Sequence, residues 1–322
     1  MNLASPPYPR HLSASKALAG LMGLCVGDAL VVPVEFSSRE ERTENPVTEL
    51  DSFNDWKELP GTWSDDSSLT FCLVECLCEG FDVQAIADSF CRWYYSGEWT
   101  ARGRVFDIGI TTQMALEKLQ TGVSPDSSGD TVERSNGNGS LMRILPMAYC
   151  HRQLPLPVLL RQVHQVSAIT HAHPRSQMAC GIYTCIAIAL LEDMPPKAAY
   201  VKGLKMADEF YSTFPFILEK HHFQRVFDGN IDALPVDTIN SEGYVVDTLE
   251  ASLWCLLTTT SYEEAVLKAV NLGEDTDTTA AVTGGLAGLL YGVTGMPARW
   301  IEGIARYQDI VALADRFEQT VY

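Results

Sequence analysis

The sequence predicts an all-α protein that forms one compact multi-helix domain. Apolar residues recur at helical spacing through most of the chain, no convincing alternation of apolar and polar residues predicts a strand, and no internal repeat is visible. The 322 residues are 46% hydrophobic and 20% charged, which is enough to bury a large core. We expect this domain at residues 14–322, after a Pro-rich leader at residues 1–13.

Two apolar stripes predict the first long helices. One stripe runs from Leu18 to Cys25, and another runs from Leu69 to Leu77 and ends near Gly80, as many helices end at glycine. Later in the chain, Ser261 and Glu264 have the spacing of a capping box at a helix start. The same periodicity predicts further helices at 83–95, 108–119, 156–167, 176–191, 198–211, 246–257, 262–270, 280–290 and 310–317.

Two acidic clusters lie far apart in the chain and share one form. Ser64-Asp65-Asp66-Ser67 and Asp275-Thr276-Asp277-Thr278-Thr279 each place two carboxylates beside hydroxyl residues at the start of an apolar helix. Capping of two helices would explain either cluster by itself. A fold that buries adjacent carboxylates needs cations to neutralise them, and oxygen ligands suit magnesium or manganese. The shared form therefore favours a two-metal hydrolytic site.

Charge and cysteine content exclude some classes of protein. With 23 basic and 41 acidic residues, the formal net charge of −18 disfavours nucleic acid and anionic membrane surfaces as partners. No apolar stretch reads as a membrane span, and the N-terminus lacks the pattern of a secretory signal. Nine cysteines, an odd number without CxxC spacing, fit buried reduced thiols. We expect a cytoplasmic protein.

Further polar and Gly-rich segments lie between the predicted helices. They are Gly27-Asp28-Ala29-Leu30 with Pro33-Val34-Glu35, Asp107-Ile108-Gly109, Asn136 to Arg143, and Thr170-His171-Ala172-His173-Pro174. Together with the acidic clusters, this ordered set resembles the ADP-ribosylglycohydrolase family over roughly residues 17–300. Any one of these motifs would be weak evidence, whereas the set in order is specific.

The resemblance implies an all-helical hydrolase that cleaves the bond between ADP-ribose and a modified protein side chain, with arginine as the expected linkage. It implies two Mg²⁺ or Mn²⁺ ions held by Ser64, Asp65, Asp66, Asp275, Asp277 and Thr278. It implies catalytic roles for Glu35, Asp65 and Asp66, with Asp28 supporting the site from behind. It implies substrate contacts at Asp107, Gly109, Asn138, Gly139, Ser140, His171 and Tyr244, with Tyr244 on the adenine.

General chemistry supports these roles. A Gly-rich loop such as Asn138 to Ser140 lets backbone N–H groups approach a diphosphate, and carboxylates stabilise the oxocarbenium-like sugar formed during glycosidic cleavage. Plainer alternatives stay open for several residues. The loop is also consistent with an ordinary turn, His171 and His173 with solvent-facing positions, and Tyr244 with core packing. Arg143 is expected to pair with a buried carboxylate or with substrate, and Gly284, Gly285 and Gly288 to serve close helix packing.

Two positions depart from the family pattern. Val31 and Glu274 both stand where glycine is usual, so we expect a narrower pocket or a tilted loop, with extra negative charge beside the second cluster. The leader lies outside the resemblance and fits a disordered segment, a surface cover or a protein contact. It motivates an alternative function, a binding or immunity protein that occludes an ADP-ribosylating toxin. A two-metal phosphohydrolase acting on nucleotides is a third reading.

Overall fold

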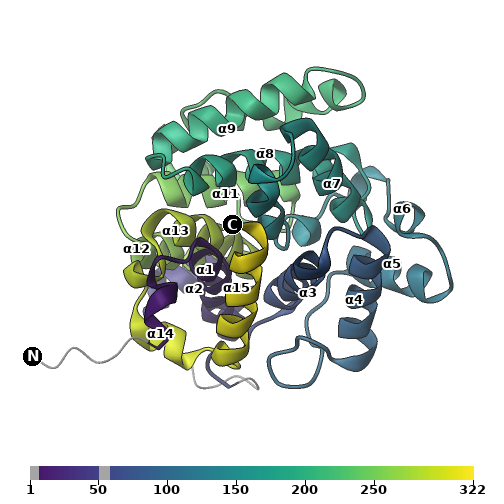
Figure 1. Cartoon of the computed structure of the whole chain (residues 1–322). Coiled ribbons are helices and arrows are strands. Elements are labelled where there is room, and N and C mark those ends of the chain that lie inside the picture. The colour runs from purple at the N-terminus through teal and green to yellow at the C-terminus, as the bar shows by residue number, and fades with distance from the viewer. Residues whose placement is uncertain (1–6, 51–58) are drawn as a thin grey trace, which may run out of the picture.

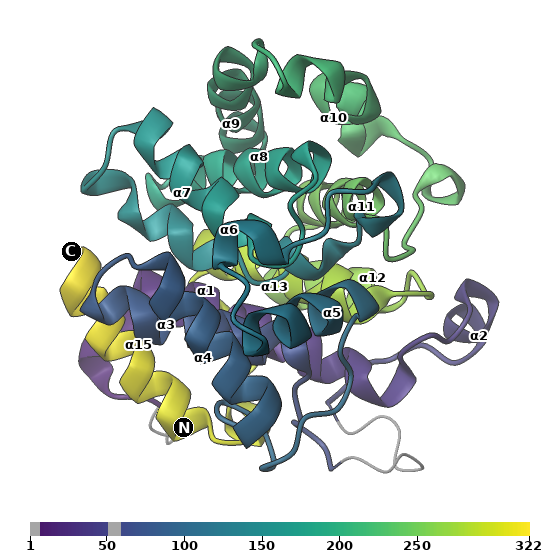
Figure 2. The same cartoon turned by 90° about the vertical axis from the view of Figure 1, so that its right-hand side faces the viewer.

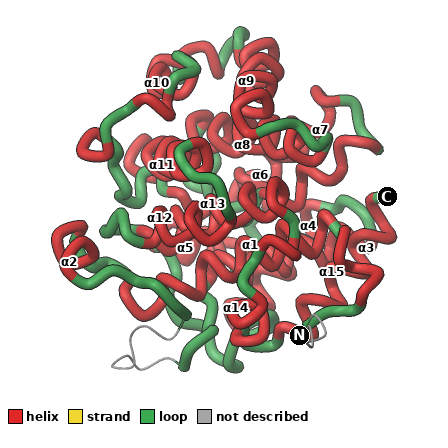
Figure 3. The backbone as a smooth tube through the Cα atoms, turned by 90° about the vertical axis from the view of Figure 1, so that its left-hand side faces the viewer, coloured by secondary structure: helices red, strands yellow, loops and turns green. Residues whose placement is uncertain are grey.

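The computed structural model describes residues 7–50 and 59–322 of the chain. Within these ranges the chain forms α-helices, short 3₁₀ helices and loops, and no β-strand (Figure 3). The prediction of an all-α fold is confirmed.

Helices α1 (Lys16–Val31) and α13 (Thr276–Tyr291) pack against each other near the centre of the molecule (Figure 1). Their backbones come close because glycines face each other. A Cβ atom at Gly23 would lie 2.4 Å from the carbonyl oxygen of Gly284, and one at Gly284 would lie 2.2 Å from that of Gly23. The helix-packing role predicted for Gly284 is therefore confirmed, and α13 begins beside the end of α1.

The remaining helices surround this central pair. Helix α9 packs on the largely buried helix α8, α11 and α12 pack on α13, and α15 packs on α1 and α3 (Figure 1). Figure 2 shows α5 at the front of the molecule in that view. Their bounds are α2 (Arg39–Glu44), α3 (Asp65–Glu79), α4 (Val83–Ser96), α5 (Ile110–Gln120), α6 (Pro125–Ser128), α7 (Leu156–Ala168), α8 (Pro174–Leu191), α9 (Pro196–Tyr211), α10 (Gln224–Phe227), α11 (Val245–Leu257), α12 (Tyr262–Val270), α14 (Ala298–Gly303) and α15 (Tyr307–Val321).

Each long helix predicted from periodicity is present. The helices not predicted are α2, α6, α10 and α14, which have four to six residues and are too short to show a periodic pattern. Helix α5 begins at Ile110 and not at Ile108, because Asp107 has a left-handed φ of 49° and Gly109 is the N-cap residue. The Ser261 hydroxyl accepts from the Glu264 backbone N–H as predicted, whereas the Glu264 carboxylate accepts from Thr260 instead.

The N-terminal region corrects one statement made from the sequence. Residues Lys16–Val34 are in fact long and apolar enough to cross a membrane, but 94% of their most apolar window is buried inside the protein. This segment is a core helix with its following turn. Before it, the described part of the predicted leader packs on the core through buried Tyr8 and Leu12. All nine cysteines are free.

Candidate active site

A cavity of about 250 Å³ gathers most of the predicted site residues. Three larger hollows of about 580, 630 and 370 Å³ lie elsewhere on the molecule, but none of them contains these residues. The predicted residues that line the cavity are Glu35, Asp65, Asp107, Gly109, Asn138, Gly139, His171, Asp275, Asp277 and Thr278. The others lie beside it or behind it, at Ser64, Asp66, Ser140 and Tyr244.

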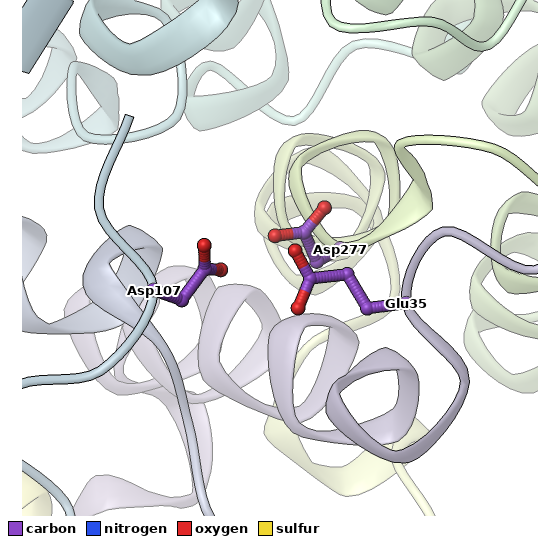
Figure 4. A group of neighbouring side chains, drawn as sticks. All are labelled: Glu35, Asp107 and Asp277. Carbon is purple, nitrogen blue, oxygen red and sulfur yellow. The ribbon is translucent and has the colours of Figure 1, made fainter. Parts of the chain in front are cut away.

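Three carboxylates from distant parts of the chain converge in this cavity. Glu35 follows the 3₁₀ turn Val32–Val34, Asp107 lies in the loop before α5, and Asp277 lies in the first turn of α13. One oxygen from each lies within 4.8 Å of the others. Figure 4 shows Asp107 and Glu35 approaching from opposite sides, with all three carboxylates directed at one space. The group can hold a metal ion. Asp277 was predicted as a metal ligand from the sequence, whereas Glu35 and Asp107 are additional candidate ligands.

The first acidic cluster is both a helix cap and part of the site. The Ser64 hydroxyl accepts a hydrogen bond from the Asp66 N–H at the start of α3. Behind it, buried Asp28 accepts from the Ser64 N–H at 3.0 Å and from the Ser67 N–H and hydroxyl at 3.0 and 2.5 Å. Asp28 thus lies where the sequence placed it, as a support for the α3 N-terminus.

The second cluster is not explained by capping. Asp275 occupies the N-cap position of α13, but its side chain makes no capping hydrogen bond. Its Oδ2 accepts instead from the Asn138 amide at 3.2 Å, and it fits there because a Cβ at Gly243 would lie only 2.4 Å from that oxygen. A bond of 3.2 Å from the Thr278 hydroxyl to Asp66 Oδ1 joins the two clusters.

Some carboxylate oxygens of the clusters have no protein partner. Among the described residues, Asp66 Oδ2 and Asp277 Oδ1 are buried and accept no hydrogen bond. A buried, unpaired carboxylate oxygen carries a large desolvation cost. These two atoms are therefore suited to binding a cation. One of them comes from each acidic cluster.

Burial raises the pKa of five carboxyl groups of the site, those of Glu35, Asp65, Asp66, Asp107 and Asp277. The pKa of Glu35 rises to about 9, first through loss of solvent and then through Asp107. Burial followed by repulsion from neighbouring carboxylates also raises the pKa values of Asp65, Asp66 and Asp277 well above the ordinary range. The cavity therefore favours bound protons or bound cations over free carboxylates.

The opposite wall of the cavity carries neutral hydrogen-bond donors. The Gly-rich loop brings Gly139 against His171 and Thr112, since a Cβ at Gly139 would lie 2.9 Å from His171 Cε1 and 3.1 Å from Thr112 Oγ1. The Thr112 hydroxyl is buried and has no hydrogen-bond partner in the described part of the chain. A phosphate oxygen is the kind of acceptor that such a wall suits.

Two predicted substrate residues, Ser140 and Tyr244, are not among the residues that line the cavity. The Ser140 hydroxyl contacts Cys180 Sγ and the Ser167 hydroxyl in the core. The Tyr244 ring is partly buried, and its hydroxyl accepts from Arg175 at 3.2 Å. Tyr244 nevertheless follows Gly243, which lines the cavity.

The solvent-facing position considered for both histidines fits His173 better than His171, and Arg143 differs from the expected pairing with a buried carboxylate. His171 is buried and not solvent-facing, whereas His173 is partly exposed and its ring nitrogen accepts from the Arg175 N–H at the start of α8. Arg143 is fully buried and makes no ion pair among the described residues. It donates to the Gly139 carbonyl at 2.8 Å and to the Thr170 hydroxyl at 2.7 Å.

The two departures from the family pattern have little effect on the cavity wall. Val31 is buried in the core and does not line the cavity. Glu274 is exposed and has a left-handed φ of 69°, which explains why glycine is favoured there. Its N–H donates to the Ser37 carbonyl at 2.7 Å, which ties the second cluster to the loop after Glu35.

Sequence reasoning missed several residues that line the cavity, among them Phe36, Ile110 and Thr112. Phe36 and Ile110 are large apolar residues with 69% and 78% exposure, and Thr112 supplies the buried hydroxyl described above. Phe36 follows Glu35 directly, and the other two follow the Asp107-Ile108-Gly109 segment. Their positions next to recognised motifs were the only available signal, because exposure and an unpaired hydroxyl are tertiary properties.

The family of the protein follows from comparison with known sequences. The sequence model of the family described as "ADP-ribosylglycohydrolase" matches residues 9–322, almost the whole chain. The chain belongs to the ADP-ribosylglycohydrolase family. The family match extends beyond both ends of the resemblance seen in the motifs and includes residues 9–13 of the predicted leader. The prediction of a hydrolase of this family is confirmed.

Individual relatives agree with the family match. The chain is 32% identical to the "ADP-ribosylarginine hydrolase Tri1" of Serratia proteamaculans, over 98% of this chain and 82% of the relative. It is 30% identical to the "ADP-ribosyl-[dinitrogen reductase] glycohydrolase" of Rhodospirillum rubrum, over 89% of each chain. Among solved structures, an "ADP-ribosylglycohydrolase-related protein complex" matches 97% of this chain with a TM-score of 0.79 and 29% identity.

Proposed function

We propose that this protein hydrolyses the glycosidic bond between ADP-ribose and an arginine side chain of a modified protein, with two Mg²⁺ or Mn²⁺ ions as cofactors. The observation that carries this proposal is the composition of one cavity. Carboxylates from partly buried Glu35 and Asp107 and from buried Asp277 converge on one side, and a Gly-rich wall of neutral donors faces them. Relatives named as ADP-ribosylarginine hydrolases support arginine as the linkage.

The donor set fits hard divalent cations. The clusters offer only carboxylate and hydroxyl oxygens, which magnesium and manganese prefer, and Asp66 Oδ2 and Asp277 Oδ1 are buried without a partner. Ser64, Asp65, Asp66, Asp275, Asp277 and Thr278 remain the proposed ligands, and Glu35 and Asp107 lie close enough to assist. When bound, the ions would orient ribose hydroxyls and activate water.

The chain's own residues have separable roles in cleavage. Carboxylates at Glu35, Asp65 and Asp66 would stabilise the positive charge that develops on the sugar. The loop at Asn138 and Gly139 would position the diphosphate through backbone N–H groups, helped by the N-terminus of α5 at Gly109. Asn138 is held for this task, because its amide donates to Asp275 and to the Thr248 hydroxyl.

Three further predictions complete the proposal. Ser140 would act through its backbone, because its hydroxyl is bound in the core. His171 would contact the diphosphate or ribose. Tyr244 would stack on adenine from the edge of the cavity, where Arg175 holds its hydroxyl. The free thiols of all nine cysteines agree with a reducing compartment such as the cytoplasm.

The test is release of ADP-ribose from an arginine-ADP-ribosylated protein in the presence of Mg²⁺, Mn²⁺ or a chelator. We expect metal-dependent release that falls by about 100-fold or more in Asp277→Asn, which keeps the side-chain shape but removes one charge. Glu302→Gln is the matched control, because it makes the same chemical change at an exposed position on α14. Equal activity of Asp277→Asn and wild type would refute the proposed site.

The substrate panel separates the alternatives. Release from serine-linked and not arginine-linked ADP-ribose would change the linkage but keep the reaction. Release of inorganic phosphate from nucleotides would indicate a phosphohydrolase. Inactivity on every substrate, together with tight binding to an ADP-ribosylating toxin, would favour the binding or immunity role.

A further inference from the structure

A chain of hydrogen bonds lies behind the His171 ring. Arg143 Nη2 donates to the Thr170 hydroxyl oxygen at 2.7 Å, and that oxygen lies 2.7 Å from His171 Nδ1. All three side chains are buried, with exposures of 0%, 0% and 2%. Solvent therefore does not compete for these contacts, and each hydrogen atom must be assigned among the three side chains themselves.

The donors and acceptors of this chain allow one fully satisfied arrangement. A guanidinium group only donates, so the Thr170 oxygen accepts from Arg143. The Thr170 hydroxyl proton then has His171 Nδ1 as its partner among the described residues. The opposite arrangement, with a proton on Nδ1, would leave the buried hydroxyl proton without an acceptor, which is unfavourable. His171 Nδ1 is thus the acceptor.

A neutral imidazole that accepts at Nδ1 carries its proton on Nε2. His171 is neutral because burial, and then the nearby Arg143 charge, lowers its pKa to about 3. The Nε2 atom faces the Gly-rich loop, since Cβ atoms built at Gly137 and Gly139 would lie 3.6 and 3.4 Å from it. Nε2 makes no hydrogen bond within the described chain, and His171 lines the cavity.

The backbone around His171 is also fixed. Its N–H donates to the Ser167 carbonyl at 2.8 Å, and the Ser167 hydroxyl donates to its carbonyl at 3.0 Å. Arg143 Nη1 donates to the Gly139 carbonyl at 2.8 Å. The buried Arg143 side chain therefore contacts both the Gly-rich loop and the hydrogen-bonded chain Arg143–Thr170–His171, which we call the relay. Ring orientation and loop position are therefore set by the same residue.

We propose that Arg143 and Thr170 are positioning residues that hold His171 as the Nε2–H tautomer, so that its ring donates a hydrogen bond to a phosphoryl oxygen of bound ADP-ribose. A neutral donor suits this cavity, because it binds the anion without forming an ion pair with the nearby carboxylates. The identity of the ligand rests on the proposed function, whereas the tautomer does not.

The test is a long-range ¹H–¹⁵N correlation spectrum of the full-length protein labelled with ¹⁵N-histidine. We expect a protonated Nε2 and an unprotonated Nδ1 for His171, assigned by the signal that is lost in His171→Asn. Thr170→Val removes the hydroxyl with little change in shape and should shift the population toward the Nδ1–H tautomer, and Thr170→Ser should restore the wild-type pattern. His164, whose Nε2 contacts the Tyr211 hydroxyl, is an internal control that should not change.

Each outcome decides one part of the proposal. An Nδ1–H tautomer of His171 in the wild type would contradict the proposed hydrogen bond from the Thr170 hydroxyl to Nδ1. The wild-type spectrum alone decides this point, even if Thr170→Val fails to fold. With the relay present, ADP-ribose should shift the Nε2–H signal and bind about tenfold more weakly to Thr170→Val. An Nε2–H tautomer that is unaffected by bound ADP-ribose overturns the phosphate contact. Failure of ADP-ribose to bind the wild type with metal present counts against the proposed function and leaves the relay intact.

Discussion

The two walls of the cavity differ in charge and in how their side chains are satisfied. The acidic wall contains Glu35, Asp107 and Asp277: Asp277 has a buried oxygen without a partner among the described residues, as has Asp66 beside the cavity, and burial raises the pKa of Glu35 to about 9. On the other wall, the donor wall, His171 is held through Thr170 by Arg143, and no lysine or arginine of the described chain lines the cavity. The first wall offers oxygen atoms that can bind cations, and the second offers hydrogen-bond donors that can bind an anion. The cavity therefore suits metal ions and a phosphorylated ligand together.

The largest expected effect comes from neutralising the acidic wall. Asp107→Asn should lower the rate of ADP-ribose release by about 100-fold or more, because Asp107 faces both Glu35 and Asp277. The same variant should unfold at a higher temperature than wild type without metal, since it removes repulsion among buried carboxylates. Glu302→Gln should change neither quantity. A parallel loss of activity and stability would show that Asp107 is structural.

Divalent cations should change how stability depends on pH. The pKa of Glu35 is raised from 4.5 to about 9 in the folded protein, so its stabilising contribution is complete below pH 4.5 and is lost as the pH rises toward 9. The metal-free protein should therefore melt at a lower temperature as the pH rises through this window. Mg²⁺ or Mn²⁺ should raise the melting temperature most at the upper end. A metal effect that is the same at every pH would contradict this account of the acidic wall.

A smaller effect is expected on the donor wall. Thr112→Val removes the unpaired hydroxyl beside Gly139 and should raise KM about tenfold, the size expected for a hydrogen bond to a charged group, with a smaller change in kcat. Thr121→Val, at the exposed C-terminal end of α5, is the control. Unchanged KM in Thr112→Val would remove this hydroxyl from the phosphate wall.

The smallest effect concerns the loop that leads into the acidic wall. Glu274→Gly should stabilise the protein by about 0.5–1 kcal/mol, because a left-handed φ of 69° is unfavourable for residues other than glycine. The gain is limited by the larger entropy of glycine in the unfolded chain. Chemical denaturation measures it, and activity should stay close to wild type because Glu274 is exposed. Reduced stability would show that the Glu274 side chain supports the loop.

Sequence reasoning predicted the long helices and the segments of the site, but not how those segments meet. The shared form of the two acidic clusters was visible in the sequence, and the bond between Asp66 and Thr278 joins them. The approach of Glu35 and Asp107 to Asp277 depends on the packing of α1 against α13 and on the loop before α5, which local patterns do not encode. The relay behind His171 was equally hidden, because an arginine near a Gly-rich loop gives no sign of its partners.

The most direct test of the two-wall account is calorimetric titration of ADP-ribose into the protein with Mg²⁺ and with a chelator. We expect affinity to fall at least about tenfold in the chelator, because the free acidic wall repels the anion that the donor wall binds. In Asp277→Asn, the dependence on Mg²⁺ should shrink. Equal affinity with and without the metal in the wild type would contradict the account, because the two walls would then not act on one ligand.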